Sequence, residues 1–105
     1  MSTTKDFKNY ILEQLELLED ITCRPMMGEF LLYYKGCLFG GIYDGRLLIK
    51  PTDNNKKFNL VEAIPYAGAK PMLMIENVDN KERNKEIITL TCKDLLKNKK
   101  NKKKQ

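Results

Sequence analysis

Two turn signals that end in glycine, Lys35-Gly36 and Asp44-Gly45, divide the segment 24–50 into three short apolar runs. A tight turn between antiparallel strands needs residues that accept a positive φ, and glycine does so without steric cost. This segment therefore predicts a three-stranded antiparallel meander, and it constrains the fold more than any other part of the chain. The strands are expected at residues 26–34, 37–43 and 46–50.

The first of these strands is apolar on both of its faces. Phe30, Leu32 and Tyr34 fall on one face, whereas Leu31 and Tyr33 fall on the other. Such a strand is either covered on both sides or has an outer face that meets a partner. The pair Gly40-Gly41 in the second strand indicates a bulge or a close approach of another backbone.

Helical patterns flank this meander. Residues 4–19 carry an apolar stripe formed by Phe7, Ile11, Leu15 and Leu18, as an amphipathic helix does. A second helix is expected at 55–63, a fourth strand at 72–78 and a last helix at 79–97. The β-branched run 87–91 leaves a strand open as an alternative within the last helix. The expected order is α-β-β-β-α-β-α, which is an α+β fold with an antiparallel sheet and flanking helices.

The charge of the chain is concentrated at its C-terminus. The formal net charge is +5, but six of the 19 basic residues lie in the last nine positions. Without them the chain has 13 basic and 14 acidic residues, a net charge of −1. We therefore expect one folded domain at 1–97, either monomeric or homodimeric, and a disordered lysine-rich tail at 98–105.

Composition narrows the function classes. The chain has no histidine, which excludes a catalytic histidine base and the usual zinc patterns. Neither a phosphate-binding glycine loop nor a secretion signal is present. The acidic residues near the end of the first helix are interpreted as a solvated face. We expect a cytoplasmic, non-enzymatic protein that has reduced cysteines, no catalytic residue, no cofactor, no metal and no membrane span.

Aromatic and methionine side chains offer two interpretations. Tyrosines on an exposed sheet face beside basic residues can stack on nucleic-acid bases, but few basic residues accompany them here. Core packing or a protein interface is favoured. Methionine pairs suit either a core or an adaptable binding surface.

Three blocks of the sequence together resemble a known family. They are RPMMGEFLLYYKGCLFGGIYDGRLLIKPT from Arg24, PYAGAKPMLMIENVDNKE from Pro65, and EIITLTCKDL from Glu86. In this order they are similar to the N-terminal domain of the TfoX/Sxy family, which is associated with the regulation of bacterial competence. The likeness covers about residues 6–97.

The resemblance implies an α+β domain of secretion-chaperone-like architecture that acts as a regulatory or protein-interaction module, linked to transcription regulation. Two-domain members carry a further helical domain, and this chain is expected to be a short single-domain member. We expect an unidentified protein partner to be bound by Phe30, Leu31, Tyr33 and Met74. The alternative is a nucleic-acid-binding accessory protein, in which the tail makes weak, non-specific contacts to polyanions through Lys99, Lys100, Lys102, Lys103 and Lys104.

Overall fold

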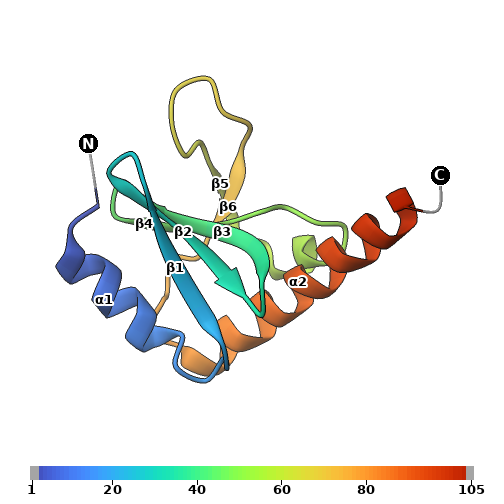
Figure 1. The fold of residues 1–105 in the computed structure, drawn as a ribbon, viewed down its shortest axis with the longest axis horizontal. Helices are drawn as coiled ribbons and strands as arrows, with labels where there is room; N and C mark the ends of the chain where they lie inside the picture. The colour runs from blue at the N-terminus through green and yellow to red at the C-terminus, as the bar shows by residue number, and fades with distance from the viewer. Residues whose placement is uncertain (1–2, 104–105) are drawn as a thin grey trace.

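The computed structural model describes the backbone of residues 3–103 and the side chains of residues 3–97. It confirms the α+β class: a six-stranded antiparallel sheet of order β1-β2-β3-β4-β6-β5 carries two α-helices (Figure 1). The elements are α1 Lys5–Gln14, β1 Ile21–Met26, β2 Glu29–Tyr34, β3 Cys37–Tyr43, β4 Arg46–Ile49, the 3-10 helix η1 Asn55–Phe58, β5 Val61–Ala63, β6 Met72–Met74 and α2 Lys81–Lys103.

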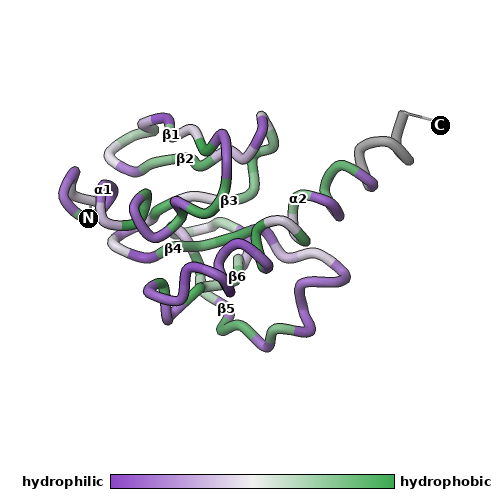
Figure 2. The backbone as a smooth tube through the Cα atoms, turned by 90° about the horizontal axis from the view of Figure 1, so that it is seen from below, coloured by the Kyte–Doolittle hydropathy of each residue, from purple (hydrophilic) through white to green (hydrophobic). Residues whose placement is uncertain are grey.

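Both α-helices pack on one face of the sheet, which we call the inner face. A single buried cluster joins Ile11 of α1, Leu32 of β2, Ile49 of β4 and Ile87 of α2. Figure 2 shows apolar segments along the central strands, and the β2–β3 and β3–β4 turns begin with the charged residues Lys35 and Asp44. Within residues 3–103, no α-helix packs on the opposite face, which we call the outer face.

The predicted meander has one more strand than expected. The expected strand 26–34 holds only the last residue of β1, then a turn at Met27-Gly28 with φ values of 50° and 85°, and then β2. Strand β1, which begins at Ile21, pairs with β2 as a hairpin. The two predicted turns are confirmed and have the same conformation: Lys35-Gly36 has φ values of 50° and 80°, and Asp44-Gly45 of 53° and 71°. Two successive residues at positive φ suit a tight hairpin turn, because its twist matches that of the strands.

The paired glycines of β3 confirm the expected bulge and close backbone approach. The register between β2 and β3 shifts at Leu32/Tyr33. A Cβ added to Gly40 would lie 2.1 Å from the carbonyl oxygen of Leu48, and one added to Gly41 would lie 2.5 Å from that of Phe30. Neither position has room for a side chain.

The prediction of a helix at 55–63 was wrong beyond the first turn. Only η1 is helical, because Asn59 adopts a left-handed conformation with φ 54° and ends it. Residues 61–63 instead form β5, which pairs with β6 at one edge of the sheet. The order α-β-β-β-α-β-α is therefore corrected to α-β-β-β-β-η-β-β-α.

Several boundaries also differ from expectation. Helix α1 ends at Gln14 instead of residue 19, and its N-cap is Thr4, whose hydroxyl accepts a hydrogen bond from the Phe7 amide. Strand β6 stops at Met74 instead of residue 78. The run 87–91 is helical, which removes the strand alternative, and α2 continues to Lys103 instead of ending at Lys97. The tail residues predicted to be disordered lie outside the residues whose side chains are described.

Candidate binding groove

The outer face carries one continuous row of cross-strand neighbours. Leu31 pairs with Gly41, Gly41 with Leu48, Leu48 with Met74, and Met74 with Val61. Paired residues of an antiparallel sheet project to the same side. None of these residues belongs to the inner buried cluster, although Leu48 itself has no exposed surface. This row of residues therefore makes the outer face of the sheet apolar.

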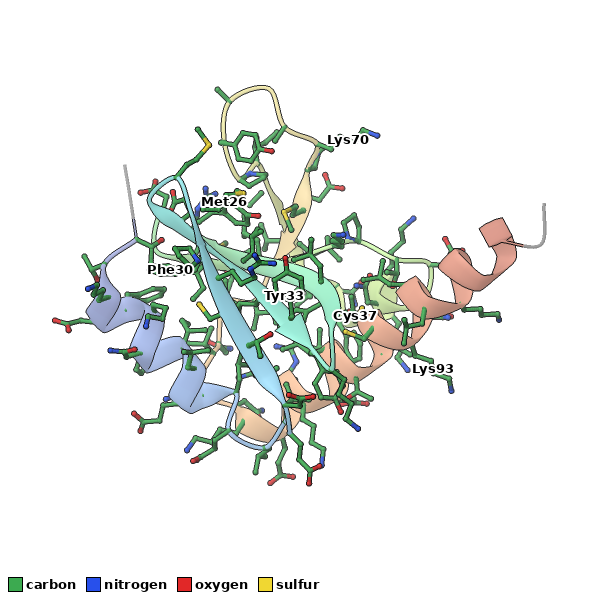
Figure 3. The ribbon with its side chains drawn as sticks, viewed as in Figure 1. Met26, Phe30, Tyr33, Cys37, Lys70 and Lys93 are labelled. Carbon is green, nitrogen blue, oxygen red and sulfur yellow. The ribbon has the colours of Figure 1, made fainter. Side chains whose placement is uncertain are left out.

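The four residues predicted to bind a partner do not share one surface. Leu31 and Tyr33 lie on the outer face, where Tyr33 pairs with Leu38 (Figure 3). Phe30 packs against the inner cluster, with the Lys8 ammonium 5.6 Å from its ring centroid. Met74 belongs to the outer row, but it borders a separate hollow of about 320 Å³ beside Phe7. Only Leu31 and Tyr33 therefore form a local pair.

A groove of about 1010 Å³ runs across the outer face and round the end of the sheet to η1 and α2. We call it the outer groove. Its apolar and aromatic lining comes from the three strands β2, β3 and β6, from the segment after β4, from the β5–β6 loop and from α2. These lining residues are Leu31, Leu38, Tyr43, Tyr66, Met72 and Leu95, with Pro51, Pro65 and Pro71.

The loop 64–71, which joins β5 to β6, forms one wall of the outer groove. The Arg46 guanidinium fixes this loop, because it donates to the carbonyl oxygens of Ile64 and Pro65 at 3.1 and 3.4 Å. Its Nε also donates to the carbonyl oxygen of Tyr43 at 3.2 Å. The Tyr66 ring approaches the Tyr43 ring, and burial, together with Tyr66 and Glu29, raises the pKa of Tyr43. The loop is thus tied to β3 and β4.

Charged side chains line the groove unequally. Lys50, Lys56 and Lys70 border it, together with the single carboxylate of Glu62. Figure 3 shows Lys70 extending from the β5–β6 loop away from the sheet. Across residues 3–97 the structure forms an ion pair between Lys81 and Glu16, which lies elsewhere, and none that involves these three lysines. The groove therefore combines an apolar floor with uncompensated positive charge.

A polar cluster joins η1 to α2 near one end of the groove. The backbone amide and side-chain amide of Asn54 donate to Asp94 at 3.0 and 2.7 Å. Asn55, which is fully buried, donates to the Thr91 hydroxyl and to the Lys50 carbonyl, both at 2.9 Å. Sequence reasoning missed this cluster, whose only local signal is a pair of asparagines in a turn. Its hydrogen bonds are internally satisfied, so we assign it a structural role.

The cysteine side chains and the metal-ligating side chains are candidate groups for a chemical site within the part of the chain that is described. All three cysteines are free, and burial is the main cause that raises the pKa of Cys92. No three metal-ligating side chains among those described come close enough to hold an ion. The helices found there are also too short or too polar to cross a membrane.

The lysines predicted to contact polyanions follow residue 97 and lie outside the described side chains. Their role stays a prediction.

No family model matches the chain. A protein of Spirochaeta aurantia, described as an uncharacterized 12.7 kDa protein in the trpE 5' region, is 28% identical over 95 residues. The alignment covers 88% of this chain and 83% of that relative, so the similarity extends over nearly the whole domain.

Proposed function

We propose that this chain is a non-enzymatic protein-binding module, and that the outer groove holds its partner. The observation that carries the proposal is a groove of about 1010 Å³ whose apolar lining, which includes Leu31, Leu38 and Met72, stays only half-buried on the sheet face away from the inner cluster. Apolar surface left without cover on a sheet face is typical of an interaction site. Ligand pockets are mainly apolar and usually span roughly 300–1,000 Å³, so this groove is at the upper end.

The proposal includes membership of the TfoX/Sxy N-terminal domain family and a role in transcription regulation. The supporting evidence is the order of the three sequence blocks. The PYAGAKP block builds the loop wall of the groove, and the block from Arg24 builds β2, β3 and β4. Two of the three blocks of the resemblance thus meet at the proposed binding surface.

The test is affinity capture from the native host with a double variant, Leu31→Ser and Tyr33→Ser. Captured proteins are identified by mass spectrometry, and thermal unfolding is recorded for each variant. We expect the partner to be lost while a cooperative thermal transition persists. The proposed role in transcription regulation is supported only if the proteins that the variant no longer captures include a component of the transcription apparatus.

A control variant removes the same two residue types, Tyr and Leu, at more exposed positions elsewhere. Tyr10 and Leu17 are each 42% exposed and lie outside the groove. The pair Tyr10→Ser and Leu17→Ser should leave capture unchanged. The proposal is disproved if the Leu31→Ser, Tyr33→Ser variant still captures the partner. It is also disproved if that variant loses the thermal transition, because Leu31 and Tyr33 would then be core residues.

A second candidate function rests on the C-terminal lysines, six of which lie in the last nine residues. Such a run attracts polyanions without reading sequence. A nucleic-acid-binding protein should bind labelled single-stranded DNA with an affinity that falls steeply as salt rises. If deletion from Asn98 onward removes all binding, the folded domain does not contact nucleic acid.

A further inference from the structure

The width of the outer groove limits what it can hold. Its lining includes Leu31 on β2, Tyr43 on β3 and Met72 on β6, and β4 lies between β3 and β6 in the sheet. Adjacent strands lie about 4.8 Å apart, so three spacings give a path of about 14 Å. An extended chain advances about 3.3 Å per residue, and the path therefore fits a segment of about four residues.

The charge of the groove limits the chemistry of that segment. Lys56 and Lys70 are exposed and Lys50 is half-buried, while Glu62 is the single carboxylate in the lining. A carboxylate brought beside these lysines gains attraction, since none of them is already paired within the described residues. The apolar floor requires apolar side chains in the same segment.

We propose that the outer groove binds an extended peptide segment in which apolar side chains alternate with Asp or Glu. This inference rests on the proposed function and adds the chemistry of the partner. The apolar side chains lie on the floor formed by Leu31, Leu38 and Met72. The carboxylates face Lys50, Lys56 and Lys70 at the rim.

Other occupants fit less well. Single-stranded nucleic acid carries a phosphate at every nucleotide, whereas most of the lining here is aliphatic and includes Glu62. A second copy of this chain, docked groove to groove about a two-fold axis, would set each rim lysine against the same lysines of its partner. Like charges in that arrangement repel.

The test uses fluorescein-labelled peptides and anisotropy with the full chain. The acidic probe is Gly-Ser-Asp-Leu-Glu-Phe-Asp-Leu-Glu-Ser-Gly. One control probe has Lys in place of each Asp and Glu, and the other has Ser in place of each Leu and Phe. We expect saturable binding of the acidic probe and at least about tenfold weaker binding of both controls, which corresponds to about 1.4 kcal/mol.

Charge-reversal variants locate the binding. Lys56→Glu with Lys70→Glu should weaken binding of the acidic probe about tenfold. The matched pair Lys85→Glu and Lys93→Glu reverses two exposed lysines that lie outside the outer groove. This pair should change the affinity for the acidic probe by no more than about twofold. The Leu31→Ser, Tyr33→Ser variant should also lose the acidic probe.

Each remaining outcome contradicts the inference in a recognisable way. If the basic probe binds as tightly as the acidic one, the charge argument is wrong. No binding of any probe, or equal binding by the Leu31→Ser, Tyr33→Ser variant, excludes the groove as a site for such peptides. Tighter binding of an oligothymidylate, reduced by the Lys56 and Lys70 reversal, assigns the groove to nucleic acid. The proposed function is tested separately, and it fails if a captured protein partner binds the Leu31→Ser, Tyr33→Ser variant as well as it binds the parent protein.

Discussion

The ring centroids of Tyr43 and Tyr66 lie 6.2 Å apart at an interplanar angle of 52°, although Tyr43 belongs to β3 and Tyr66 to the β5–β6 loop. Tyr43 is buried, whereas Tyr66 is 59% exposed. The pair thus has one ring on the floor of the outer groove and one in its wall. Tilted aromatic contacts of this kind stabilise by about 0.5–1.5 kcal/mol, so the wall is held without being buried.

Arg46→Ala should loosen the loop 64–71 without unfolding the sheet. The variant loses hydrogen bonds to three backbone carbonyls, those of Tyr43, Ile64 and Pro65. We expect faster amide hydrogen exchange across 64–71 and a loss of about 1–2 kcal/mol of unfolding free energy. Arg46→Lys is the matched control, and it should rescue little because an ammonium lacks the planar fork of a guanidinium. Unchanged exchange in the loop would show that Arg46 does not fix it.

Gly40→Ala should destabilise the domain far more than Gly36→Ala. A methyl group at Gly40 would meet the Leu48 carbonyl oxygen at 2.1 Å and the Ile49 Cα at 2.8 Å, both in backbone that cannot move aside. Gly36 has open space around it and is strained only by its φ of 80°. We expect a loss of about 3 kcal/mol or more for Gly40→Ala and about 1 kcal/mol for Gly36→Ala in urea unfolding. Equal losses would contradict the close approach.

Asp94 should make the stability of the domain depend on pH in the acid range. Hydrogen bonds from Asn54 hold the pKa of this carboxyl below its ordinary value of 3.8. A group with a lowered pKa in the folded state stabilises above its unfolded pKa, and that contribution is lost as the pH falls through the folded pKa. Asp94→Ala should therefore cost about 1–2 kcal/mol near neutral pH and progressively less below about pH 4.

The exposed neighbour Asp53 is the matched control for Asp94. Chemical unfolding across a pH series measures all three proteins, and Asp53→Ala should follow the parent at each pH. A constant difference between Asp94→Ala and the parent at every pH would mean that the carboxylate charge plays no part.

Cys92 should be the least reactive thiol of the native protein. Its side chain is 3% exposed, and burial and its neighbour Cys37 raise its pKa. Because the thiolate is the reactive form, iodoacetamide at about pH 8 should label Cys37 before Cys92. Peptide mass spectrometry follows the order of labelling, and concentrated guanidinium should abolish the difference. Equal rates in the folded protein would disprove the burial of Cys92.

Local features of the fold were accessible from the sequence because their causes lie within a few residues. The turns at Lys35-Gly36 and Asp44-Gly45 are decided by the φ values of two adjacent residues. The first hairpin was missed for a related reason. Met27 is an apolar residue at positive φ, so its turn lacks the polar first residue that Lys35 and Asp44 give the other two turns. Pairing with β1 overrides its local preference.

The amino-acid sequence by itself determined the α+β class, two of the three X-Gly hairpin turns and the need for glycine at positions 40 and 41. Only the tertiary structure decided that residues 61–63 are a strand and that the helices cover the face of Phe30 and leave the face of Leu31. It also decided the outer groove, because Arg46 contacts Ile64 across 18 positions of the chain. Turn conformation depends on local sterics, whereas strand pairing and a groove depend on partner groups that folding brings together from distant positions.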